Sequence, residues 1–172
     1  MNPSNSAYDL TGNMLKYLVT NTKQNAMPEA QWADGDFDWW KKGVLRQFYQ
    51  DEFLDTFVYQ IDGLAKYGYI FYPNKCVDGS EQCRVHMHLH GCGQTADGLF
   101  LGYQALSDGG WMEYAVANNI ILVLPQAKFD LFSNPRECFD YTNYAEWWDE
   151  TEAFTWNGIQ PKALKGMLDR VI

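Results

Sequence analysis

The residues best suited to chemistry lie where an apolar stretch ends at a glycine-flanked cysteine. The run 85–89 alternates apolar residues with histidines, and His90, Gly91, Cys92 and Gly93 follow it. Glycine lets the backbone approach a ligand closely. A Cys92 amide held there could donate a hydrogen bond to an oxygen that becomes negatively charged during acyl transfer, which is a strongly stabilising contact in catalysis. The alternative is a plain turn between a strand and a helix.

Three histidines precede this cysteine at alternate positions. His86, His88 and His90 would point to one face of an expected strand over 84–90. Two of them with a distant third ligand could hold zinc. All three together span about 13 Å at the rise of a strand, which is too far for one ion. We therefore expect histidines packed against their neighbours, and we predict neither a metal nor another cofactor.

A nucleophile to accompany the cysteine loop is missing from the sequence. No serine stands in the G-x-S-x-G pattern of a strained nucleophile turn. A Ser-His-Asp triad assembled from distant residues is a possible alternative, and Cys92 with His90 as its base is another. Adjacent residues on a strand point to opposite faces, which argues against direct proton transfer between those two. The serines are Ser4, Ser6, Ser80, Ser107 and Ser133.

The four cysteines predict disulfides. Cys76 and Cys83 enclose Asp78-Gly79-Ser80, which is a good turn sequence, and Cys92 and Cys138 remain. An even count with one close pair indicates disulfides and an oxidising compartment. A zinc site would need closely spaced pairs such as C-x-x-C, and the chain has none.

Composition limits the class of protein. The chain has 172 residues, enough for one domain with a real core, and 47% of them are hydrophobic. Its net charge of −9 disfavours binding to nucleic acid, and no apolar run is long enough to span a membrane. The acidic stretches 34–38 and 149–152 are best explained as solvated loops. A calcium site is the alternative, but neither stretch has a full set of oxygen ligands.

The hydrophobic pattern places these residues on a strand–loop–helix series. Such a series predicts a parallel α/β layer. We divide the single partial domain of 1–172 into a helix with an insertion loop, 1–42, and a sheet-forming part, 43–172. Helices are expected over 9–19, 110–118 and 158–172, strands over 43–48, 66–73, 84–90 and 120–124, and irregular segments over 20–38 and 131–154.

Most of the seven tryptophans fall in or near the expected loops. Such residues can cover the edge of a core with their amphipathic rings. The alternative is an exposed aromatic surface that grips an apolar solid or a polymer. The residues concerned are Trp32, Trp39, Trp40, Trp147, Trp148 and Trp156.

The order of these motifs resembles the polyhydroxybutyrate depolymerase family of esterases. The resemblance covers most of the chain from Tyr8 to Ile172 except the insertion at 20–38, and its form is the fungal, secreted, single-domain one. That form is a circularly permuted α/β-hydrolase in which the catalytic serine, aspartate and histidine precede the oxyanion-hole strand. The matching segments are 68–73, 89–95, 110–111, 120–127 and 134–141.

The resemblance implies that the chain corresponds to the C-terminal half of such a hydrolase, with a largely parallel sheet and flanking helices. Cys92 would supply an oxyanion-hole N–H and would be held by a disulfide to Cys138. Trp147 and Trp148 would line the substrate crevice, and His86 and His90 would have no catalytic role.

Two functions follow as expectations. The first is part of a secreted ester hydrolase acting on a polyester or on hydroxyacid esters, with a missing N-terminal half or a partner chain supplying the nucleophile. The second is an inactive half-domain that serves as a structural or binding module in a larger assembly. The first residues, 1–6, lack the pattern of a signal peptide. An open sheet edge would favour a tightly bound partner or self-association.

Overall fold

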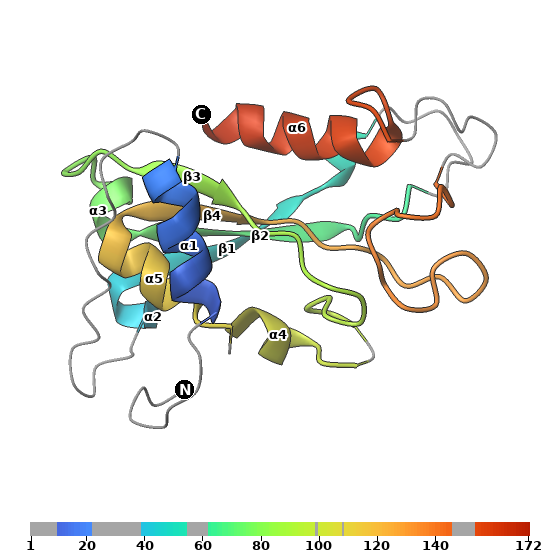
Figure 1. The fold of residues 1–172 in the computed structure, drawn as a ribbon, viewed down its shortest axis with the longest axis horizontal. Coiled ribbons are helices and arrows are strands. Elements are labelled where there is room, and N and C mark those ends of the chain that lie inside the picture. Colours follow the sequence, from blue (N-terminus) through green and yellow to red (C-terminus); the bar gives the residue numbers. More distant parts are fainter. Residues whose placement is uncertain (1–9, 22–38, 55–61, 99, 108, 146–153) are drawn as a thin grey trace.

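A mixed four-stranded sheet organises the chain, with helices on both of its faces (Figure 1). The computed structural model describes residues 10–21, 39–54, 62–98, 100–107, 109–145 and 154–172. The strands are β1 (Gly43–Tyr49), β2 (Tyr67–Pro73), β3 (Arg84–Met87) and β4 (Ile120–Leu124). The helices are α1 (Leu10–Asn21), α2 (Trp39–Lys42), α3 (Asn74–Val77), α4 (Tyr103–Ser107), α5 (Trp111–Asn118) and α6 (Ile159–Val171), with a 3-10 turn, η1, at Asp51–Phe53.

The strand order is β1-β2-β4-β3, and only β3 and β4 run parallel. β2 is antiparallel to both β1 and β4. The prediction of a largely parallel sheet was therefore wrong. Parallel neighbours need a crossover connection, and in this sheet only the segment that contains α4 and α5, between β3 and β4, makes one.

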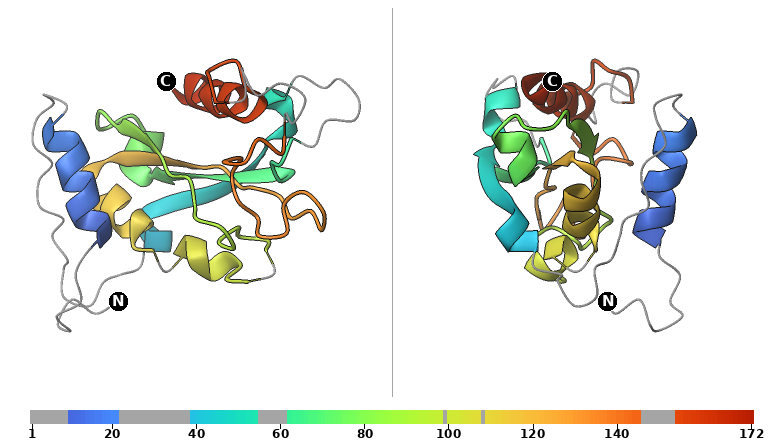
Figure 2. Two further views of the ribbon diagram at one scale, coloured as in Figure 1. Left: turned by 45° about the vertical axis from the view of Figure 1, so that its right-hand side comes forward. Right: turned by 90° about the vertical axis from the view of Figure 1, so that its left-hand side faces the viewer.

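Alternating side chains divide the core into two layers. On one face, Phe71 and Leu122 pack with α5 and with Leu15 of α1. On the other face, Ile70 and Val123 pack with α6. Figure 2 shows α6 and α5 on opposite sides of the sheet, with α1 off to one side of α5. The sheet is therefore covered on both sides, as in α/β proteins.

The boundaries of the two longer helices of 109–172 follow from local chemistry. Asn119 ends α5 with a left-handed conformation at φ 54°, and its amide donates to Ala115 O. Pro161 lies in the first turn of α6, where no intrahelical N–H bond is required. β4 matches its predicted range of 120–124. β3 ends at Met87, three residues short of the predicted range 84–90, although the His88 N–H still donates to Val123 O.

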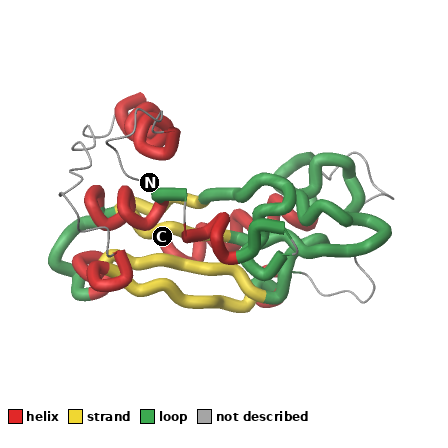
Figure 3. The backbone as a smooth tube through the Cα atoms, turned by 90° about the horizontal axis from the view of Figure 1, so that it is seen from below, coloured by secondary structure: helices red, strands yellow, loops and turns green. Residues whose placement is uncertain are grey.

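The loops that follow the strands β3 and β4 gather at one end of the molecule (Figure 3). The insertion predicted at 20–38 lies outside the described residues, apart from its first two residues in α1. Among the described helices, none is long and apolar enough to cross a membrane.

Candidate functional site

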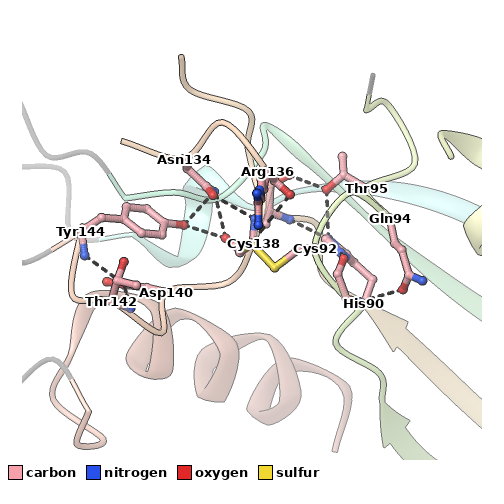
Figure 4. Close-up of a disulfide and its surroundings, with 12 residues drawn as sticks. His90, Cys92, Gln94, Thr95, Asn134, Arg136, Cys138, Asp140, Thr142 and Tyr144 are labelled. Carbon is pink, nitrogen blue, oxygen red and sulfur yellow. Dashed lines mark hydrogen bonds between the residues drawn. A yellow bond between two sulfur atoms is a disulfide. The ribbon is translucent and has the colours of Figure 1, made fainter. Parts of the chain in front are cut away.

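The candidate site is the loop that leaves β3 and crosses the end of the sheet beside the loop after β4. A disulfide joins them, because Cys92 is bonded to Cys138 with their Cα atoms 4.3 Å apart. The second disulfide, Cys76–Cys83, closes the turn before β3. Both predicted disulfides are thus present. Figure 4 shows the first of them at the junction of the two loops.

A tight turn fixes the amides around Cys92. Gln94 donates its N–H to Gly91 O at 3.2 Å, and Gly93 has a φ of +70°, which glycine adopts readily. Gly91 donates to the Gln94 side-chain oxygen at 2.8 Å, and Gly93 donates to Arg136 O at 2.6 Å. Cys92 is exposed, and within the described part of the chain its N–H has no acceptor. It is therefore a donor without an acceptor, in a turn whose neighbouring amides are bonded.

His90 anchors the same turn through both ring nitrogens. Its Nδ1 lies 2.7 Å from Gly91 O, and its Nε2 accepts the N–H of Ala127 at 3.0 Å. Because Nε2 accepts, the partners assign the ring proton to Nδ1. The Thr95 hydroxyl lies 2.9 Å from Nε2 and donates to Ala127 O at 2.7 Å. The ring also packs against Phe139, with centroids 4.8 Å apart. His90 thereby ties the turn to the loop after β4.

The other two histidines pack against α5. The rings of His86 and His88 lie 5.5 and 4.0 Å from the ring of Trp111. Within residues that the structure describes, no group of three His, Cys, Asp or Glu side chains could hold a metal ion. His86 and His88 thus stack on a helix that covers the sheet.

We expect the free energy of unfolding to fall as the pH falls from 6.5 toward 4. Burial lowers the pKa of His86, His88 and His90 below 6.5, and that of His88 falls to about 4 with a further contribution from its two neighbours. Over this range the unfolded chain binds protons that the folded chain does not. Each histidine then lowers the free energy of unfolding by up to about 1.4 kcal/mol per pH unit.

Urea unfolding at a series of pH values measures this slope. The stability that comes from the neutral rings is fully present above pH 6.5. A His88→Phe variant should reduce the slope by about one proton between pH 6.5 and 4.5. A slope that is unchanged in this variant would contradict the prediction.

Asn134 and Tyr144 build the opposite side of the disulfide. The Asn134 amide donates to Lys128 O, Cys138 O and the Tyr144 hydroxyl, and its oxygen accepts the Cys138 N–H. The Tyr144 hydroxyl donates to Cys138 O at 2.8 Å and accepts a bond from Gln160 of α6. Burial raises the pKa of Tyr144 to about 12, so the hydroxyl stays protonated. This network holds Cys138 in place (Figure 4).

A Tyr144→Phe substitution should lower the free energy of unfolding by about 1–2 kcal/mol, because Cys138 O and two side-chain amides lose a buried partner. Tyr141→Phe is the matched control, since Tyr141 is 67% exposed. Its effect should stay within about 0.5 kcal/mol. The measurement is urea unfolding at pH 7. Equal effects of the two substitutions would show that the network contributes nothing.

A buried carboxylate behind the turn leaves no room for a side chain at position 98. Glu137 is fully buried with a φ of +54°, and its carboxylate occupies the space that a Cβ on Gly98 would need. Its negative charge raises the pKa of His90, against the larger effect of burial. Gln126 binds the next part of the loop, because its side-chain oxygen accepts the Ala96 N–H at 2.7 Å. These contacts hold the segment that directly follows the Cys92 turn.

Only three of the tryptophans predicted near loops lie within the described residues. Trp147 and Trp148 lie outside the described residues, as does Trp32. Trp39 packs edge-on against Phe71, so it covers the core, whereas Trp40 and Trp156 are exposed. The sequence pattern did not single out Asn134 or Tyr144 as site residues, because their contacts lie in an irregular segment without periodicity. Asn134 belongs to the segment 134–141, which entered the sequence analysis only through the family resemblance.

Comparison with known proteins identifies relatives of one kind. No protein-family model matches the chain. It is 28% identical over 130 residues to a polyhydroxybutyrate depolymerase of Talaromyces funiculosus, a match that covers 70% of this chain and 37% of the relative. It is 28% identical over 172 residues to a poly(3-hydroxybutyrate) depolymerase of Delftia acidovorans. That match covers 98% of this chain and 29% of the relative.

Two solved structures agree with these matches. The PHB depolymerase from Penicillium funiculosum has a TM-score of 0.67 and 26% identity, with 94% of this chain and 47% of that chain covered. A serine-to-alanine variant of a PHB depolymerase, complexed with an R3HB trimer, has a TM-score of 0.68 and 26% identity, with 95% and 48% covered. The predicted relationship to these depolymerases is therefore confirmed. The chain spans about a third of the length of the curated relatives and about half of the solved structures.

Proposed function

We propose that this chain forms the oxyanion-hole portion of a secreted carboxylic ester hydrolase of the PHB depolymerase type. The observation that carries the proposal is the Cys92 amide. This N–H has no acceptor among the described residues and belongs to an exposed residue, whereas the amides of Gly91, Gly93 and Gln94 are all bonded. A donor fixed in this way needs no reorganisation when charge develops on a substrate oxygen.

The chemistry then divides between two segments. A serine carried by a complementary segment attacks the ester carbonyl, and the carbonyl oxygen becomes negatively charged. The Cys92 N–H donates a hydrogen bond to that oxygen, the alcohol departs, and water hydrolyses the resulting acyl-serine to release the acid. This division fits a chain without a G-x-S-x-G serine.

The alternative of Cys92 as nucleophile with His90 as its base is disfavoured by the geometry. The Cys92 sulfur is bonded to Cys138, so it has no thiolate to attack an ester. Both His90 ring nitrogens are engaged with backbone groups of the scaffold, so the ring is poorly placed to accept a proton from a nucleophile. The chain therefore contributes electrostatic stabilisation and depends on another segment for the nucleophile.

We further propose a polyester substrate and secretion into an oxidising compartment. The relatives are named for polyhydroxybutyrate, so we assign a polyester of hydroxyacids or its short esters as the substrate. Trp147 and Trp148 would line the crevice for it. The disulfides Cys76–Cys83 and Cys92–Cys138 are consistent with secretion into an oxidising environment.

A labelling experiment on the native protein tests the function. A serine-directed fluorophosphonate should label a chain or segment that accompanies residues 1–172, and the labelled peptide should contain a G-x-S-x-G-like sequence. Mass spectrometry identifies that peptide and the intact mass. If neither label nor ester hydrolysis is found, the half-domain is an inactive module of a larger assembly instead. That second function is favoured only by the absence of a nucleophile motif.

A further inference from the structure

A buried pair of glutamines connects the end of β1 to the loop after β4. Gln50 directly follows β1 and is fully buried, and Gln126 lies two residues beyond β4 and is 3% exposed. The Gln50 side-chain oxygen accepts the Gln126 main-chain N–H at 3.0 Å, and its amide group donates to Gln126 O at 2.9 Å. It also donates to Ala65 O at 2.6 Å. Gln50 therefore fixes the main chain of Gln126 through both its N–H and its C=O.

The Gln126 side chain satisfies its hydrogen bonds in one orientation only. Its oxygen accepts the Ala96 N–H at 2.7 Å, and its amide group donates to Leu124 O and Pro125 O at 3.1 and 2.9 Å. A flipped amide would place donors against the Ala96 N–H and an oxygen against two carbonyl oxygens. Ala96 is itself buried, so its N–H depends on this acceptor.

The direction of the Cys92 N–H depends on the peptide group that it shares with Gly91 O. A trans peptide is planar and its N–H and C=O point in opposite directions, so the contacts of Gly91 O also orient the Cys92 N–H. Gly91 O accepts the Gln94 N–H at 3.2 Å and lies 2.7 Å from His90 Nδ1. The disulfide holds Cys92 through its sulfur, which does not by itself set the direction of the N–H.

We propose that Gln126 is a positioning residue for the Cys92 amide, with Gln50 as its support. Gln126 holds the Ala96 N–H, which fixes the chain two residues after Gln94. Gln94 in turn holds the carbonyl of the peptide that contains the Cys92 N–H. The effect on catalysis rests on the proposed function, in which this N–H is the oxyanion donor. Displacing a group at the reacting centre by 1 Å can cost about 100-fold in rate.

A Gln126→Glu variant of the assembled esterase tests this role through pH. A protonated carboxyl accepts the Ala96 N–H and donates to one carbonyl oxygen, whereas a carboxylate repels both carbonyl oxygens. Burial raises the pKa of such a carboxyl to about 8. Relative to the unaltered protein, the kcat of the variant should be about 10- to 100-fold lower at pH 9 than at pH 7, with little change in KM. His90, which accepts the N–H of the adjacent Ala127, is neutral over this range because burial lowers its pKa below 6.5.

Carbon-detected NMR of the full chain follows the two peptide nitrogens independently of activity. Between pH 7 and pH 9, the peaks of the Cys92 and Ala96 nitrogens should move together in Gln126→Glu and stay in place in the unaltered chain. Asn118→Asp is the matched control, because Asn118 is also buried and donates to a main-chain oxygen, Tyr114 O, but lies before β4 rather than after it. It should lower stability and leave kcat and both peaks unchanged.

A Cys92 peak that stays in place in Gln126→Glu, whether or not the Ala96 peak moves, would overturn the positioning role. Failure of the proposed function is a different result: both peaks move, but the kcat ratio is the same at the two pH values. If Gln126→Glu does not fold, Gln50→Met replaces it, because that change removes only the support of the Gln126 main chain. Both peaks should then differ from those of the unaltered chain, and an unmoved Cys92 peak would again contradict the role.

Discussion

Replacing both Cys92 and Cys138 by alanine should lower the free energy of unfolding by about 4 kcal/mol. The disulfide joins residues 46 positions apart, and closing a loop of this length removes a large amount of entropy from the unfolded chain. A domain of this size is stabilised by only about 5–15 kcal/mol in total. The substitution therefore removes a large share of the stability. Urea unfolding of the two proteins side by side measures the difference.

The other disulfide provides the matched control. Cys76 and Cys83 are 7 positions apart, so the corresponding double alanine variant should lose only about 2.5 kcal/mol. Alkylation without reductant should modify no cysteine of the unaltered chain. If thiols at Cys92 and Cys138 react, or if the short-loop variant is the less stable one, the long loop is not the source of stability.

The fold shows which parts of a sequence determine structure locally. The apolar run Ile120–Leu124 predicted β4 because a strand that is covered on both faces of the sheet needs no polar face. The direction of β2 was not predictable in the same way. Its own residues are buried on both faces whichever way it runs, and its antiparallel pairing with β1 and β4 depends on how distant segments meet.

In the candidate site, too, some features follow from the local sequence and others depend on distant segments. The glycines around Cys92 indicate a tight turn, because a positive φ at Gly93 favours glycine. The role of His90 could not be inferred from alternation along the strand. Its ring is held by Ala127 and Phe139, which are more than thirty residues away. Alternation predicts a face of the strand but not the partner that occupies it.

The largest effect on activity should come from a Gly93→Ala substitution, which removes no polar group from the turn. A Gly93→Ala substitution puts a side chain on a residue with a φ of +70° and brings its Cβ to 3.2 Å from the Phe100 ring. The exposed Phe100 ring can move aside, but the positive φ stays unfavourable for alanine, so we expect the turn to shift. Because Gly93 immediately follows Cys92, the shift moves the Cys92 amide away from the substrate oxygen. The loss of one such donor lowers kcat by about 100- to 1000-fold.

The result should be a fall in kcat with little change in KM, because the contact forms fully only in the transition state. The measurement is steady-state hydrolysis of a soluble ester by the assembled esterase. Gly79→Ala is the control: Gly79 has a φ of +72°, and a Cβ there would have no neighbour within 4 Å. It incurs the same backbone strain, far from the turn, so it should reduce stability but leave kcat unchanged. Equal kcat values for the two variants would mean that the Cys92 amide is not the oxyanion donor.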